Sequence, residues 1–143
     1  MAIESLSHIT LLVADLERTA RMLMDVLDAV EIYDSGAHRF SIAPEKFLLI
    51  GGVWIAIMEG SPLPERSYRH VAFKIAGSDF DLYRDRIARA GLELRTARAR
   101  VQGEGESIYF YDYDNHLFEL HTGTLQERLQ RYDRSRTENE STP

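Results

Sequence analysis

Two stretches of the chain decide its fold: "SLSHITLLVADLERT" (residues 5–19) and "YRHVAFKIAGSDFD" (residues 68–81). Each carries a histidine, His8 or His70, at the start of a run rich in β-branched and apolar residues. Such runs predict strands over residues 8–13 and 70–75, and the acidic turn and apolar spacing after each run predict a helix. The recurrence of one pattern after about 62 residues indicates an internal repeat.

Both repeats continue with the same kinds of element. Asp15 is a suitable N-cap for the first helix, and Gly91 is a suitable end for the second. Strand-like pieces follow each helix: "EIYDS", "RFSIA", "EKFLLIG" and "VWIAIMEG" in the first repeat, and "LELRTAR", "SIYFYD" and "HLFELHTG" in the second. The segment "DYDNH" (residues 112–116) predicts a turn between the last two strands. Each unit therefore has a βαβββ pattern, and we predict an α+β fold of paired βαβββ repeats that form a curved open barrel.

A linker separates the two repeats, because residues 61–67 hold two of the four prolines. One unit is an open curved sheet that cannot cover its own concave face, so two units, in one chain or across a dimer, are needed to enclose a site. The polar end of the chain predicts a short helix and then a disordered tail. The expected organisation is a first module at residues 1–60, a linker at 61–67, a second module at 68–123, a helix at 124–132 and a tail at 133–143.

Composition excludes several classes of function. The 143 residues carry a formal net charge of −6, which disfavours a nucleic-acid partner. The absence of cysteine excludes disulfides, thiolate metal sites and a cysteine nucleophile. No apolar run approaches the length of about 20 residues that a membrane helix needs, and the N-terminus has no signal-peptide pattern. We therefore expect a cytoplasmic protein that does not bind membranes.

Alternation along the strands predicts a metal site. Because residues i and i+2 of a strand share a face, His8, His70 and Glu119 can all point into one cleft from equivalent edges of the two repeats. The position equivalent to Glu119 in the first repeat falls near Ala56, so one carboxylate serves the pair of repeats. Two imidazoles and one carboxylate leave coordination positions open, which suits a divalent first-row metal that acts as a Lewis acid on a substrate oxygen.

The remaining histidines compete for this role. His121 shares the face of Glu119 and is the strongest rival ligand, whereas His38 and His116 fall in turn-like contexts. A lone histidine on a strand is more often an ordinary core or surface residue than a metal ligand. The residues alone leave the choice between these explanations open.

The paired βαβββ pattern with its two histidines and Glu119 resembles the vicinal oxygen chelate (glyoxalase-type) superfamily. More narrowly, residues 1 to about 131 resemble the fosfomycin resistance proteins. The most specific part is "SIYFYDYDNHLFELHTGTL" (residues 107–125), and "EKFLLIG" and "ERSYRHVAFKI" also match. Within that family the chain is most similar to the thiol-independent branch, the fosfomycin hydrolases.

The resemblance implies a homodimer in which the two repeats exchange partners, so that the barrel is completed across a domain swap. His8 of one subunit would then meet His70 and Glu119 of the other around Mn²⁺, or around another divalent first-row metal. It also implies the substrate fosfomycin, an epoxide that carries a phosphonate. The product of the hydrolase reaction would be a vicinal diol.

The resemblance assigns the general base of this branch to Glu45. The glutathione-using relatives have a tyrosine where this chain has Phe47, and they lack a matching glutamate. Chemistry agrees, because water is a poor nucleophile that needs a general base, whereas a thiolate does not. Without the resemblance, Glu45 would be interpreted as a solvated carboxylate at the start of a strand.

The resemblance also predicts how the substrate is held. Thr10 would donate a hydrogen bond to the epoxide or phosphonate oxygens. The chain departs from the transferase pattern at Ala99, where that branch has a lysine, and at Gly103, where it has a serine. Arg98 and Arg100 are expected to supply the missing charge, and their alternation does not choose between them. The predicted substrate-binding residues are Ser107, Tyr109, Arg128, Arg98, Arg100, Trp54 and Tyr68.

Three alternatives remain on the sequence alone. The chain could be a metal-dependent thiol transferase that uses glutathione or bacillithiol. It could be a non-catalytic dimer of the same fold that binds the antibiotic. Its native substrate could also be a different epoxide or phosphonate.

Overall fold

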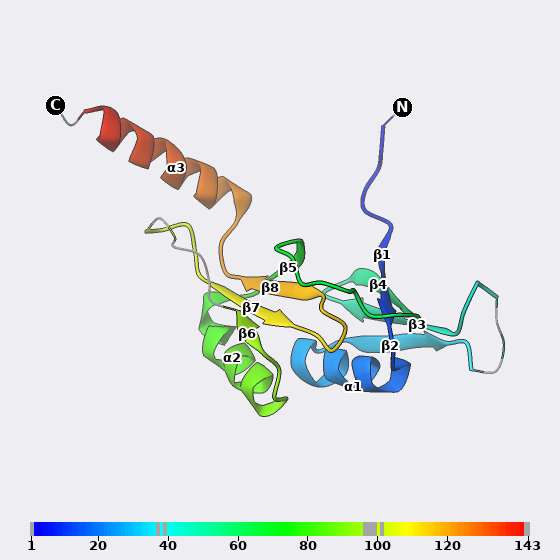
Figure 1. Ribbon diagram of the computed structural model, residues 1–143. Helices are drawn as coiled ribbons and strands as arrows, with labels where there is room; N and C mark the ends of the chain where they lie inside the picture. Colours follow the sequence, from blue (N-terminus) through cyan, green and yellow to red (C-terminus); the bar gives the residue numbers. More distant parts are fainter. Residues whose placement is uncertain (1, 37, 39, 96–99, 101, 142–143) are drawn as a thin grey trace.

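The computed structural model describes residues 2–36, 38, 40–95, 100 and 102–141 (Figure 1). The first repeat contains β1 (His8–Val13), α1 (Leu16–Leu27), β2 (Val30–Asp34), β3 (Glu45–Ile50) and β4 (Val53–Glu59). The second contains β5 (His70–Lys74), the short 3-10 helix η1 (Gly77–Asp79), α2 (Phe80–Arg89), β6 (Leu94–Arg95), β7 (Ser107–Tyr111) and β8 (Leu117–His121). Helix α3 (Leu125–Glu140) follows the second repeat.

The two repeats form two four-stranded sheets with the same strand order, β1-β4-β3-β2 and β5-β8-β7-β6. In each sheet the first and last strands of the unit are parallel and the other pairs are antiparallel. The predicted βαβββ repeat is therefore confirmed. Thr10 pairs with Ala56 in one sheet and Ala72 pairs with Glu119 in the other, so Ala56 is the equivalent of Glu119, as predicted.

One apolar core joins the two repeats. Helix α1 begins at the predicted N-cap, where the Asp15 side chain accepts a hydrogen bond from the Arg18 backbone N–H. Its buried face packs on β3 and β4, and α1 also contacts α2 (Figure 1). Leu23, Ile87 and Phe118, from both repeats, belong to a single buried cluster. The helices thus cover one face of each sheet, which leaves the opposite faces for functional side chains.

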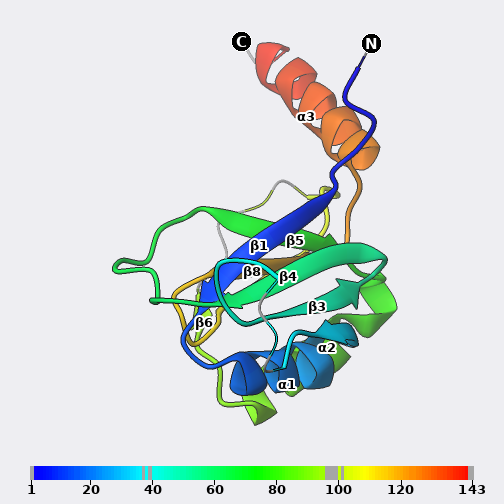
Figure 2. The same ribbon diagram turned by 90° about the vertical axis from the view of Figure 1, so that its right-hand side faces the viewer.

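The structure differs from the sequence-based prediction at the end of the chain. Helix α3 continues to Glu140, so the predicted end at residue 132 and the predicted disorder of the tail are wrong for the described residues up to 141. Thr124 caps the helix by accepting a hydrogen bond from the Glu127 backbone N–H, and residues 125–140 contain no glycine or proline. Polar composition predicted disorder, but residues 133–140 mix strong helix formers, Arg and Glu, with weaker ones and extend the capped helix that precedes them. Figure 2 shows α3 projecting from the body of the protein.

Two smaller segments also differ. Residues 40–43 of the expected "RFSIA" strand form bends instead, and β6 is limited to Leu94 and Arg95 within the described part of "LELRTAR". Among the described residues, no helix is long and apolar enough to cross a membrane.

Candidate active site

Glu119 lies at the centre of a polar cluster on the free face of the second sheet. The residue is 4% exposed, on the central strand β8. Its Oε1 accepts hydrogen bonds from Ser107 Oγ at 2.7 Å and Tyr109 OH at 2.9 Å, and Arg100 Nη2 lies 2.8 Å from the same oxygen. Its Oε2 lies 3.0 Å from His70 Nε2. The structure thus brings together four of the side chains that the sequence predicted around this carboxylate.

The hydrogen bond of His70 prepares its ring for a metal. His70 Nδ1 lies 2.6 Å from the backbone carbonyl oxygen of Tyr68, which can only accept, so Nδ1 carries the proton. In the neutral ring, Nε2 is then an unprotonated ligand that faces Glu119. Two adjacent ligands of an octahedral divalent ion, each about 2.1 Å from it, lie about 3.0 Å apart. The donor types and their separation therefore fit one divalent cation.

The surroundings of Glu119 keep it ionised. Burial alone would raise its pKa, but the hydrogen bonds from Ser107 and Tyr109 and the positive charge of Arg100 outweigh that effect and hold the pKa below its usual value. Burial, with the hydrogen bonds to Tyr68 and Glu119, raises the pKa of Tyr109. Tyr109 therefore remains a hydrogen-bond donor and Glu119 an anionic carboxylate at neutral pH.

Arg100 has unused hydrogen-bonding capacity. Its Nη2 contacts Tyr109 OH at 2.9 Å as well as Glu119, and its side chain is 12% exposed. The buried Nε and Nη1 atoms have no hydrogen-bond partner among the described residues. A buried guanidinium with free donors suits an oxyanion such as a phosphonate. Arg98, its predicted alternative, lies outside the described residues.

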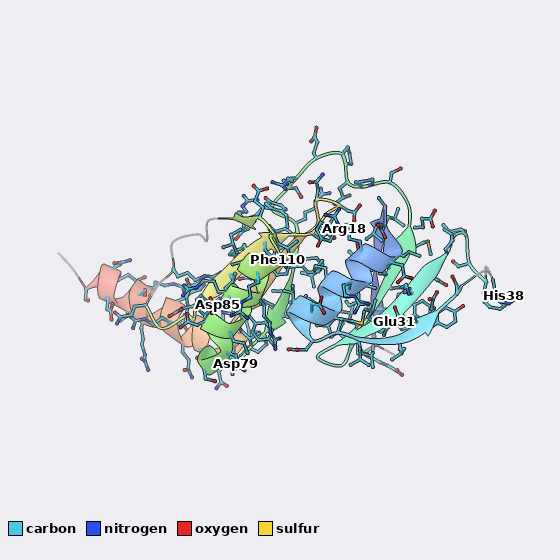
Figure 3. All side chains as sticks on the ribbon, turned by 90° about the horizontal axis from the view of Figure 1, so that it is seen from below. Arg18, Glu31, His38, Asp79, Asp85 and Phe110 are labelled. Atoms are coloured by element: carbon cyan, nitrogen blue, oxygen red, sulfur yellow. The ribbon has the colours of Figure 1, made fainter. Side chains whose placement is uncertain are left out.

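The rival ligand His121 is engaged differently. Its Nδ1 lies 2.7 Å from Ser107 Oγ and 3.9 Å from Glu119 Oε1, and its Nε2 lies 3.2 Å from Arg128 Nη2. Burial and the charges of Arg100 and Arg128 lower the pKa of His121, so the ring is neutral and its Nε2 can accept from Arg128. His121 thus links Arg128 to the cluster, rather than forming a short contact with Glu119. Figure 3 shows His38, another competitor, in the loop after β2, far from the second sheet.

Sequence reasoning missed the roles of Glu104 and Gly105 in the loop beside Arg128. Glu104 is fully buried, accepts a hydrogen bond from Tyr132 OH at 2.5 Å and places Oε2 3.8 Å from Arg128 Nε. Gly105, at φ +96°, lets this loop approach Gly123 so closely that a Cβ atom at position 105 would lie 2.7 Å from the Gly123 nitrogen. An acidic residue between two glycines was the available signal in the sequence.

The first sheet presents a second group of predicted residues. The His8 ring lies 4.2 Å from the Trp54 ring, and Phe47 meets Trp54 edge-on at 5.0 Å. Glu45, 9% exposed, begins β3, and the alternation of that strand puts it on the same face as Phe47. None of the described residues donates a hydrogen bond to its carboxylate. Thr10 lies two residues after His8 on this face.

The registers make the two faces comparable position by position. His8 corresponds to His70, Phe47 to Tyr109, Glu45 to Ser107 and Ala56 to Glu119. The first sheet therefore offers one histidine, one threonine and one carboxylate among aromatic and apolar side chains, whereas the second offers a carboxylate surrounded by hydrogen-bond donors. Within the described part of one chain, no three His, Cys, Asp or Glu side chains converge to hold a metal. His70 and Glu119 meet, but His8 lies on the other sheet.

Comparison with known proteins places the chain in a family. Residues 5–120 match the model of the Glyoxalase/Bleomycin resistance protein/Dioxygenase superfamily. Fosfomycin resistance protein FosX of Mesorhizobium japonicum is 60% identical, with 90% of this chain and 93% of that protein covered. The chain belongs to the FosX fosfomycin resistance proteins. The predicted resemblance is confirmed.

Further relatives separate this family from the thiol-using one. FosX of Listeria innocua is 58% identical, with 91% of this chain and 98% of that protein covered. Metallothiol transferase FosB of Staphylococcus saprophyticus is 34% identical, with coverage of 91% and 84%. Among solved structures, a mutant of FosX from Listeria monocytogenes, complexed with Mn(II) and 1S,2S-dihydroxypropylphosphonic acid, has a TM-score of 0.84 at 55% identity, covering 92% of this chain and 99% of that chain.

Proposed function

We propose that this chain is a Mn²⁺-dependent fosfomycin hydrolase that opens the epoxide with water and forms a vicinal diol. The observation that carries the proposal is the cluster of His70, Arg100, Ser107 and Tyr109 around the buried Glu119 carboxylate. The FosX complex from Listeria monocytogenes supports it, because that protein holds Mn(II) and a phosphonate with two adjacent hydroxyl groups. Addition of water to the epoxide of fosfomycin would produce such a diol.

His8, His70 and Glu119 would hold the metal, which supplies a Lewis acid for the epoxide oxygen when bound. Because His8 lies on the first sheet, we propose that His8 of the partner subunit completes the set in a domain-swapped homodimer. The first module, residues 1–60, would then face the second module, residues 68–123, of the other subunit, with 61–67 as the linker. The unequal faces of the two sheets support this pairing, since each supplies what the other lacks.

Glu45 would act as the general base. Its carboxylate accepts a proton from water while the water oxygen bonds to the carbon that bears phosphorus and the bond from that carbon to the epoxide oxygen breaks. The released oxygen takes a proton from solvent to complete the diol. Thr10 would donate a hydrogen bond to the epoxide or phosphonate oxygens from the same sheet face.

The phosphonate would bind at the free donors of the second sheet. Arg100 offers its Nε and Nη1 atoms, which have no partner among the described residues, and Tyr109, whose OH donates to Glu119, would lie beside them. Ser107 and Arg128 would complete the polar part of the phosphonate site, and Arg98 is a further candidate for binding the phosphonate. Trp54 of the first sheet, and Tyr68, which lies beside Tyr109, would contact the rest of the substrate.

The test is ³¹P NMR of fosfomycin with metal-stripped protein, before and after Mn²⁺ is restored, with no thiol present. Conversion to one diol that requires Mn²⁺ and is abolished in Glu45→Gln is the expected result. Turnover that begins only when glutathione or bacillithiol is added would instead identify a thiol transferase. Binding of fosfomycin without turnover under either condition would identify an antibiotic-binding dimer.

A further inference from the structure

The proposed general base stands at a strand end whose backbone is held by hydrogen bonds on one edge and by strand pairing on the other. Glu45 is the first residue of β3, a position where a strand commonly frays. Its backbone N–H donates to Ser35 Oγ at 3.0 Å, and its carbonyl oxygen accepts from the Ser35 N–H at 3.0 Å. On the other edge of β3, Glu45 pairs with Met58 of β4. Ser35 is 5% exposed, so these two hydrogen bonds are shielded from water.

The next residue anchors the same strand end from the opposite face. Lys46 Nζ lies 3.0 Å from Glu17 Oε1 of α1, and 2.9 Å from Glu31 Oε1 and Asp34 Oδ2 of β2. Its side chain is 4% exposed. Burial alone would lower the pKa of Lys46, but the three carboxylates outweigh that effect and raise it, so the cation is retained. Figure 3 shows Glu31 on β2 beside α1, where this ion-pair group joins helix and sheet.

We propose that Ser35 and Lys46 are positioning residues for Glu45. Ser35 fixes the backbone from which the carboxylate projects, and Lys46 ties the following residue to α1 and β2. The inference rests on the proposed hydrolase function, in which Glu45 must hold a water molecule within hydrogen-bond distance of its carboxylate. A displacement of 1 Å in such a group can cost about a hundredfold in rate, so the support of this strand end has a direct kinetic consequence.

The decisive variant is Ser35→Ala, which removes the acceptor for the Glu45 N–H. We expect kcat for thiol-free hydrolysis to fall by about tenfold to a hundredfold. The KM for fosfomycin and the affinity for Mn²⁺ should stay within about twofold, because the proposed phosphonate donors and two of the three proposed ligands lie on the second sheet. Ser35→Thr keeps a hydroxyl at this position and should restore most of the lost kcat.

A matched control is available in the same repeat. Thr19 of α1 is 1% exposed, and its Oγ1 has no hydrogen-bond partner among the described residues. Thr19→Ala therefore removes an equally buried hydroxyl that has no link to Glu45, and its kcat should match that of the wild-type protein. A loss of kcat in Thr19→Ala as large as that in Ser35→Ala would attribute both effects to general destabilisation and overturn the proposal.

Four further outcomes separate the inference from the proposed function. Unchanged kcat in Ser35→Ala, with an active wild-type protein, overturns the role of Ser35 alone. A parallel loss of Mn²⁺ affinity would also overturn it, because the effect would then not be confined to the base. In a Glu45→Gln background, Ser35→Ala should change the residual rate by less than about twofold, since the positioned group is already gone. Absence of diol formation by the wild-type protein overturns the proposed function itself.

Discussion

The substitution Arg100→Met separates the two roles that Arg100 could have, because it should weaken substrate binding without weakening metal binding. Arg100 offers two buried donors, Nε and Nη1, that have no partner within the described part of the chain, to the proposed phosphonate. A hydrogen bond to a charged group contributes about 1.5–3 kcal/mol, so the loss of both should remove about 3 kcal/mol or more from transition-state binding. That corresponds to a fall of about a hundredfold or more in kcat/KM for fosfomycin.

Arg100→Met should not weaken the binding of Mn²⁺ and should, if anything, strengthen it. Arg100 Nη2 lies 2.8 Å from Glu119 Oε1, so the guanidinium repels a cation bound to that carboxylate. Its removal should leave the dissociation constant for Mn²⁺ unchanged or smaller. Initial rates from ³¹P NMR at several fosfomycin concentrations give kcat/KM, and the electron paramagnetic resonance signal of free Mn²⁺ gives the metal affinity.

Arg84→Met is the control for this experiment. Arg84 lies on α2, and its Nη2 pairs with Asp81 Oδ1 at 2.7 Å. Its kcat/KM should stay within about threefold of wild type, because the substitution lies outside the proposed site. The reasoning is refuted if Arg100→Met keeps its kcat/KM, or if its Mn²⁺ affinity falls as much as its kcat/KM, since Arg100 would then serve the metal ligand and not the substrate.

Three further predictions concern stability. Lys46→Met should lower the free energy of unfolding by about 1–3 kcal/mol at pH 7, because three carboxylates lose their shared cation. The control Lys74→Met should change it by less than about 0.5 kcal/mol. Chemical denaturation at fixed protein concentration measures both, and equal effects would contradict the ion-pair argument. The hydrogen bond from Arg86 lowers the pKa of Asp28, so this pair stabilises the folded state at neutral pH and that contribution is lost as the pH falls below about 4. Asp28→Asn keeps a residue suited to the local φ of 54°. It should be less stable than wild type by a few tenths of a kcal/mol at pH 7, and this difference should shrink as the pH falls below about 4; a difference as large in acid as at pH 7 would count against the electrostatic cause. Gly105→Ala should lower the melting temperature, because it adds a Cβ where φ is +96° and places that atom 2.7 Å from the Gly123 nitrogen. The expected cost in stability is about 1–3 kcal/mol. A melting temperature equal to that of the wild-type protein would show that the loop relaxes freely.

Much of the fold was accessible from the sequence because it depends on local periodicity. The alternation of side chains along β1, β5 and β8 has a period of two residues whatever the tertiary structure, so it put Thr10 beside His8 and His121 beside Glu119 on their strand faces before any contact was known. The repeat predicted the same βαβββ pattern twice, and the two sheets indeed have the same strand order. The same local reasoning misjudged α3, because polar composition predicts disorder, whereas the capped helix extends through residues of mixed helix propensity as far as Glu140.

The sequence by itself determined the two βαβββ units, the candidate ligands His8, His70 and Glu119 and, through the family resemblance, the candidate base Glu45. Only the tertiary structure shows the contacts that these side chains make within one chain. His70 lies beside Glu119, whereas His8 lies on the other sheet. Arg100 contacts Glu119, and the Glu45 backbone N–H donates to Ser35. The physical reason is that the periodicity of a strand depends only on neighbouring residues. The contacts, in contrast, join residues of different elements. How closely those elements approach depends on the twist of the sheets, on glycine conformations in loops and on the packing of one shared core.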